Sequence, residues 1–127
     1  MTAITVLIEN FNREELQCKC GCKQLNIDTE FLIKLQAFRY LLKKPLNVTC
    51  ASRCKKHNKE VGGESTSCHI CEGKQSTAAD VTNSNCAEIY NLATRSGLFN
   101  EVMYYKKQNF VHLGLDRKQN GNYFVIK

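Results

Sequence analysis

Two stretches of the chain place apolar residues at the three- to four-residue steps of an α-helix. The first helix is predicted over residues 29–43, with Asp28 as its N-cap and Pro45 ending it. The second is predicted over residues 84–96, before Gly97, where a left-handed backbone suits glycine. The apolar faces consist of Phe31, Leu35, Phe38 and Leu42 in the first helix and Cys86, Ile89, Tyr90 and Ala93 in the second.

Short runs of β-branched, aliphatic and aromatic residues predict strands over residues 46–49, 102–105, 110–115 and 123–126. The pair Asn120-Gly121 before the last run is typical of a hairpin turn. Alternation within residues 110–115 places Val111 and Leu113 on one face of the strand and His112 on the other. Gly114, on the same face as His112, leaves room there for a ligand.

The segment of residues 51–77 is rich in Lys, Ser, Gly and Asn, so we expect it to be mostly irregular and exposed. Loops of that length are often functional. With 127 residues, we expect one domain over residues 1–127.

Charge and targeting signals narrow the classes of protein only slightly. The 18 Lys and Arg against 12 Asp and Glu give a net charge of +6, which favours an anionic neighbour such as a phosphate-rich cell wall. The first nine residues contain an apolar run without a basic leader or a cleavage site, so no signal peptide is predicted, and no stretch is long enough to span a bilayer. We therefore expect synthesis in the cytoplasm, no membrane insertion, and a monomer.

The 8 cysteines fit either a disulfide scaffold or, in a reducing cytosol, free thiols and metal ligands. Cys18, Cys20 and Cys22 could bind a structural zinc together with Cys50 or Cys54, although their spacing is tighter than that of ordinary zinc knuckles. Cys68 and Cys71 bracket His69, and could capture a metal or form a disulfide. The sequence leaves these alternatives open.

Three residues form the candidate metal site: His69, Asp80 and His112. Two imidazoles and one carboxylate are the ligand set of a catalytic zinc that keeps a fourth position open for water. Alone the triplet is a weak signal, because any chain with three histidines offers such triplets; His69 could be an exposed histidine, and Asp80 could cap a helix, although Ser84 or Asn85 would do so more naturally.

The surrounding residues strengthen that interpretation. Over residues 11–117 the chain resembles the zinc D-alanyl-D-alanine carboxypeptidase family, in particular its compact phage and bacterial branch that cleaves peptidoglycan peptides. The resemblance is carried by Phe11, Glu15, Cys18, Gly21, Cys22, Ser52-Arg53-Cys54, His57-Asn58, Val61-Gly62-Gly63, Ser67-x-His69, Ala78-Ala79-Asp80 and Phe110-Val111-His112.

The resemblance implies an α+β fold, with a small antiparallel sheet, helices packed on one face and a zinc cleft on the other. It implies one zinc ion held by His69, Asp80 and His112, and Arg53 as the group that binds the substrate carboxylate or the developing oxyanion. Peptidoglycan peptides would be the substrate, and the enzyme would act at the bacterial cell wall after release from the cell.

The chain departs from the family pattern at three places. Ten residues separate His69 from Asp80, more than in relatives, which indicates an insertion that we expect to loop outward. Asn109 stands where many relatives carry an acidic general base, and Gly114 where an aspartate often follows the last histidine. Glu101 is the acid that we predict to carry the proton instead.

The sequence also offers two alternative functions. A relative that has lost its general base would keep the zinc and serve as a wall-binding or structural phage module, which Asn109 and Gly114 favour. A cysteine-rich module that binds nucleic acid is disfavoured because the lysines are scattered and no aromatic residues interleave with them.

Overall fold

The computed structural model describes residues 10–127. The N-terminal run that lacks signal-peptide features, residues 1–9, lies outside the described residues. Within residues 10–127, no helix is both long and apolar enough to cross a membrane.

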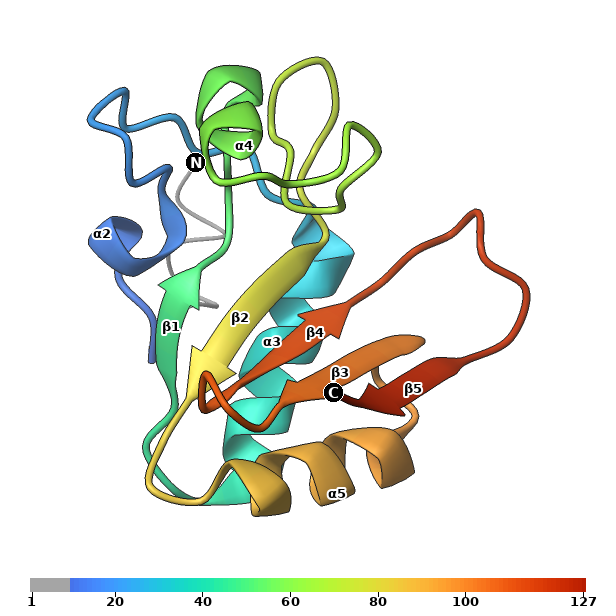
Figure 1. Cartoon of the computed structure of the whole chain (residues 1–127). Coiled ribbons are helices and arrows are strands. Elements are labelled where there is room, and N and C mark those ends of the chain that lie inside the picture. Colours follow the sequence, from blue (N-terminus) through green and yellow to red (C-terminus); the bar gives the residue numbers. More distant parts are fainter. Residues whose placement is uncertain (1–9) are drawn as a thin grey trace.

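The centre of the fold is a five-stranded mixed sheet in the order β1-β2-β4-β3-β5 (Figure 1). All neighbouring strands are antiparallel except β3 and β5, which run parallel. The α+β class is therefore confirmed, and the predicted antiparallel sheet is extended by one parallel strand, β5. The strands are β1 (Asn47–Cys50), β2 (Ala78–Thr82), β3 (Glu101–Tyr105), β4 (Phe110–Gly114) and β5 (Tyr123–Ile126).

The hairpin predicted at Asn120-Gly121 does not form. Gly121 does take a left-handed backbone, with φ of 73°. However, both edges of β4 are already paired, with β2 on one side and β3 on the other, so β5 cannot pair with it. The chain instead carries β5 around to the free edge of β3, with which it pairs in parallel.

Both predicted helices are present. Helix α3 (Thr29–Leu42) begins after Asp28, whose side chain accepts a hydrogen bond from the Phe31 N–H. Helix α5 (Cys86–Ser96) is capped by Asn85 and ends at the left-handed Gly97. Each boundary lies within two residues of the sequence-based one.

The helices and the sheet share one core. Phe31 and Phe38 of α3 pack around Phe99, with ring centroids 6.0 and 5.7 Å away. The same cluster contains Ile89 of α5 and the aliphatic face of the sheet, represented by Val111. The opposite face of β2 and β4 is left free for polar side chains.

The segment 51–77 differs from the expectation of an exposed, irregular loop. It contains a short helix, α4 (Lys55–Glu60), and its second half is partly buried, including Ile70 and Ser76. Isolated parallel bridges join Arg53 to Ile70 and Ile27 to Ser76, so the backbone is paired with other segments although few residues form regular elements. A second unpredicted helix, α2 (Arg13–Leu16), precedes α3.

Candidate metal centre

Two of the predicted metal ligands come from neighbouring strands. Asp80 of β2 and His112 of β4 are direct cross-strand partners, and the Asp80 Oδ1–His112 Nδ1 distance is 3.1 Å. Their neighbours Val81 and Val111 point into the core, so alternation directs the two polar side chains to the other face. As the alternation of residues 110–115 predicted, His112 lies opposite the aliphatic face.

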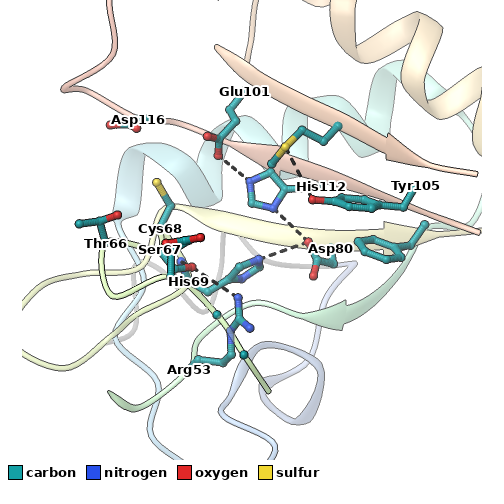
Figure 2. Close-up of a pocket in the computed structure, with 15 residues that line it drawn as sticks. Arg53, Thr66, Ser67, Cys68, His69, Asp80, Glu101, Tyr105, His112 and Asp116 are labelled. Carbon is teal, nitrogen blue, oxygen red and sulfur yellow. Dashed lines mark hydrogen bonds and ion pairs between the residues drawn. The ribbon is translucent and has the colours of Figure 1, made fainter. Parts of the chain in front are cut away.

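The third ligand, His69, lies on the loop that leads to β2. Its Nε2 is 3.2 Å from Asp80 Oδ1, the same oxygen that faces His112 (Figure 2). Its Nδ1 is 2.7 Å from the carbonyl oxygen of Ala51, to which it donates. That bond orients the ring so that Nε2 is the nitrogen that faces the carboxylate. His69 is buried, with 2% of its surface exposed.

The distances around the Asp80 oxygen suit a zinc ion. Bonds of about 2.1 Å in a tetrahedral site place two ligand atoms about 3.4 Å apart. The distances of 3.2 and 3.1 Å from the Asp80 oxygen to the two ring nitrogens are close to that spacing. The donor set has two imidazoles and one carboxylate, and it borders a pocket of about 450 Å³ that is open to solvent.

A second carboxylate contacts His112 from the opposite side. Glu101 Oε1 lies 2.6 Å from His112 Nε2, so each nitrogen of the ring faces a carboxylate. Glu101 is on β3, directly across from Gly114 of β4. A Cβ atom on Gly114 would lie only 2.6 Å from Glu101 Oε1 and 3.0 Å from His112 Nε2. The Glu101 carboxylate therefore occupies the space that a side chain at position 114 would need.

The contacts among these groups shift their pKa values. Burial lowers the pKa of His112, but hydrogen bonds to Asp80 and Glu101 outweigh it and raise the pKa to about 9. Burial raises the pKa of Asp80, yet the contacts with both histidines bring it well below its ordinary value. The hydrogen bond to His112 likewise lowers the pKa of Glu101 against the effect of burial. The carboxylates are therefore ionised at neutral pH.

Arg53 lies at the edge of the same pocket. Its backbone N–H donates to the His69 carbonyl oxygen at 2.7 Å, and its Nη2 approaches Ser67 Oγ at 3.4 Å. Its Nε atom is buried and has no hydrogen-bond partner among the described residues. Because Arg53 lines the pocket, its guanidinium is a candidate partner for an anionic group that enters there.

The pocket also has an apolar wall that the sequence did not indicate. Tyr105 and Phe110, at the ends of β3 and β4, stack with ring centroids 4.5 Å apart and line the pocket. Their proximity follows from the pairing of Tyr105 with Phe110 across the two strands. An occupant could therefore contact aromatic surface on one side and Arg53 on the other.

Cys50 is a neighbour of the site that the residue pattern did not single out for it. Its Sγ lies 3.7 Å from His69 Nδ1, and it pairs with Asp80 across β1 and β2. Burial, followed by the charge of Asp80, raises the pKa of the thiol to about 12. The Cys50 thiol, a ring nitrogen of His69 and a carboxylate oxygen of Asp80 lie within 4.8 Å of one another, so Cys50 is an alternative to His112 as the third ligand. A prediction that β1 pairs with β2 would have placed Cys50 beside Asp80.

Three further features of the site were anticipated from the sequence: the insertion before Asp80, the cysteines that flank His69, and Asn109. The insertion between His69 and Asp80 does loop outward, since residues 73–75 are exposed. Cys68 lines the pocket, and its thiol is free, as is that of Cys71. Asn109 occupies the turn between β3 and β4 with a left-handed φ of 60°, and its carbonyl oxygen accepts from Thr82 Oγ1.

Comparison with known proteins gives one family. The family described as Peptidase M15 matches residues 9–114, which include all the side chains of the pocket discussed above except Asp116. No curated protein matches the chain.

Proposed function

The chain belongs to the peptidase M15 family, a family of metal-dependent peptidases, and from this premise we propose that it is a zinc peptidase of bacterial cell walls. The proposed substrates are the stem peptides or cross-links of peptidoglycan, and the proposed setting is a phage or prophage wall hydrolase of the D-alanyl-D-alanine carboxypeptidase type. The observation that carries the proposal is the convergence of His69, His112 and Asp80 Oδ1 beside the unpartnered Nε of Arg53.

His69, Asp80 and His112 would hold the zinc through Nε2, Oδ1 and Nδ1. When bound there, the ion would supply a Lewis acid that polarises the scissile carbonyl and makes a water nucleophilic near neutral pH. The protein contributes a fixed geometry, since two ligands stand on paired strands and the ring of the third is oriented by Ala51. Such preorganisation avoids rearrangement during the reaction.

Arg53 is the proposed anchor for the substrate. Its guanidinium is charged at all relevant pH values and can grip a carboxylate at two points. Peptides that end in a free carboxylate offer such a group, and so does the oxyanion that develops when a peptide carbonyl is attacked. The backbone hydrogen bond from Arg53 to His69 joins the two segments that carry the anchor and the metal ligand.

Glu101, which the sequence indicated as the proton carrier, contacts the ring nitrogen of His112 that faces away from Asp80. This contact supports a positioning role first: the Nε2–H donates to Glu101, which orients the ring and increases its basicity as a ligand. Transfer of the proton by Glu101 stays a prediction. Asp116, which lines the same pocket, is the other acid to be tested.

Digestion of purified peptidoglycan tests the proposal. The zinc-loaded protein should release peptide or amino-acid fragments detectable by mass spectrometry, and His112→Ala and Asp80→Ala should reduce release to the protein-free level. His57→Ala is the matched control, because His57 lies on α4 outside the pocket. Absence of fragments from the loaded wild type, together with an unchanged metal content in His112→Ala, would refute the assignment.

A second function has an observation in its favour. The position where relatives carry the acidic base is Asn109, which lies in a turn and is not among the pocket residues. A protein with an intact metal centre and no base would bind the wall without cleaving it. Zinc-dependent sedimentation with peptidoglycan, with no fragment released over long incubation, would select this alternative.

A further inference from the structure

A second group of possible metal ligands lies away from the pocket. Cys18, Cys20 and Cys22 belong to the loop after α2, and Cys54 is the N-cap of α4. The four Sγ atoms lie within 4.8 Å of one another. We call these four residues the thiol cluster.

The distances within the thiol cluster differ from those of a disulfide. Cys20 Sγ is 3.6 Å from both Cys18 Sγ and Cys54 Sγ, and all four thiols are free. A disulfide would require about 2.05 Å. In a tetrahedral zinc site with Zn–S bonds of about 2.3 Å, two sulfur atoms lie about 3.8 Å apart. The observed spacing is therefore that of sulfurs around a common ion.

Backbone N–H groups donate hydrogen bonds that stabilise thiolates at two members of the thiol cluster. The Cys54 N–H donates to Cys18 Sγ, and the His57 N–H donates to Cys54 Sγ, both at 3.4 Å. Amide donors to ligand sulfurs are typical second-sphere contacts that stabilise thiolates. They also hold these two sulfurs, which belong to buried residues, in place before a metal arrives.

The loop itself has the shape that three closely spaced ligands need. It turns back through Gly21, which has a left-handed φ of 98°, and the Cys18 N–H closes it by donating to the carbonyl oxygen of Gln24 at 2.8 Å. The narrow spacing of the three cysteines, which argued against a zinc knuckle in the sequence, is accommodated because the fourth ligand comes from α4.

We propose that the thiol cluster binds a structural zinc ion through four thiolates. Four sulfur ligands leave no open position, so this ion would take no part in hydrolysis. Its effect would be to tie the N-terminal loop to the start of α4, immediately after Arg53. Zinc suits such a set because it accepts thiolates and prefers four-coordinate tetrahedral geometry. The proposal is independent of whether the pocket is catalytic.

Metal counting separates this site from the pocket. The full-length protein, purified without chelator and loaded with zinc, should contain about two zinc ions per chain by mass spectrometry, one for each site. Asp80→Ala should retain the ion of the thiol cluster, and Cys20→Ser should lose it while keeping the other. Cys86→Ser is the matched control, since this thiol lies on α5 with its own contacts to Thr82 and Asn109, and it should retain both ions.

Cobalt gives a spectroscopic readout in the wild type as well as in a variant. Wild type and Asp80→Ala loaded with Co²⁺ should both show strong thiolate-to-cobalt charge-transfer absorption, which a site of imidazoles and carboxylate cannot produce. Loss of all bound metal in Asp80→Ala, iron in place of zinc in the cluster, or a disulfide between two of the four thiols in freshly purified protein would each overturn the proposal.

Discussion

His112 has a carboxylate at each ring nitrogen, Asp80 at Nδ1 and Glu101 at Nε2. Both contacts favour a ring that carries two protons when no metal is bound, and they raise the pKa of His112 to about 9. A metal that binds through Nδ1 must displace the proton there. Proton and metal therefore compete for one atom.

We expect zinc uptake by the metal-free protein to release a proton near pH 7, and the apparent affinity of the pocket to rise as the pH is increased. Calorimetric titration in buffers with different ionisation enthalpies measures the released protons. The experiment should use Cys20→Ser, so that the pocket is the site being filled, with Cys20→Ser/His112→Ala as its control. Equal proton release by both proteins would show that His112 is not the source.

The Glu101 carboxylate occupies the space above Gly114, the position where relatives often carry an aspartate. We propose that Glu101 takes the place of the aspartate that the family resemblance implies at position 114. Glu101→Gln should lower activity or zinc affinity by about 10- to 100-fold, the usual effect of losing the partner of a metal-bound histidine. Glu60→Gln, on α4 outside the pocket, distinguishes that loss from a general effect of removing charge.

Moving the carboxylate from position 101 to position 114 provides a sharper test of the exchange. Glu101→Ala should be impaired, and the double variant Glu101→Ala/Gly114→Asp should recover activity because the new aspartate would take the vacated space. Gly114→Ala alone should fold, since Gly114 lacks a left-handed backbone, but it should displace Glu101 and resemble Glu101→Gln. A double variant no better than Glu101→Ala would disprove the exchange.

At the scale of elements, the start of α3 combines a cap with an ion pair. Asp28 accepts from the Phe31 N–H at 2.9 Å and from Arg117 Nη2 at 2.8 Å. Asp28→Ala should lower the free energy of unfolding by about 1 kcal/mol, mostly through the lost cap. Asp28→Asn keeps an oxygen for the cap, and should cost less because exposed ion pairs contribute little. Denaturant titration of both variants measures the difference, and equal losses would contradict it.

The elements also show what local sequence could predict. The two long helices could be predicted because their capping residues, the spacing of their apolar residues and Gly97 are all local features of the sequence. The partner of β5 depends on which strand edges remain free after β4 has paired on both sides, and no local pattern carries that information. The burial in segment 51–77 similarly arises from pairing with distant residues such as Ile27.

At the scale of the whole molecule, the charges in the pocket determine where the metal-free fold is most stable. The pKa of His112 lies above its ordinary 6.5, so its contribution is complete below about pH 6.5 and is lost as the pH rises through about 9. The pKa of Asp80 lies below its ordinary 3.8, so its contribution is complete above about that pH and is lost in stronger acid.

We therefore expect the metal-free protein to resist denaturant best between about pH 4 and pH 6.5, as far as these groups determine it. Urea midpoints measured in the presence of chelator across that range and up to about pH 10 test the expectation. In His112→Ala the decline on the alkaline side should be smaller. The same alkaline decline in both proteins would assign it to other groups.

The sequence predicted which residues form the site more readily than it predicted the contacts between them. Order and spacing indicated His69, Asp80, His112 and Arg53, because their types and intervals match a family pattern. The contacts of Glu101 and Cys50 depend on the strand pairs β3–β4 and β1–β2, which become visible only in three dimensions. For the loop cysteines the sequence had offered Cys50 or Cys54 as a fourth ligand, and the structure places Cys54 there.

The pocket has walls of two kinds. Asp80 and His112 stand on central strands whose other face is core, whereas Arg53 and His69 are carried by a segment held through scattered backbone bonds and, as proposed, by the thiol cluster. The exposed residues 73–75 of the second wall can therefore change in length without disturbing the strands that carry Asp80 and His112. A rewritten loop there would leave the ligands in place, provided that His69 and Arg53 keep their backbone bonds.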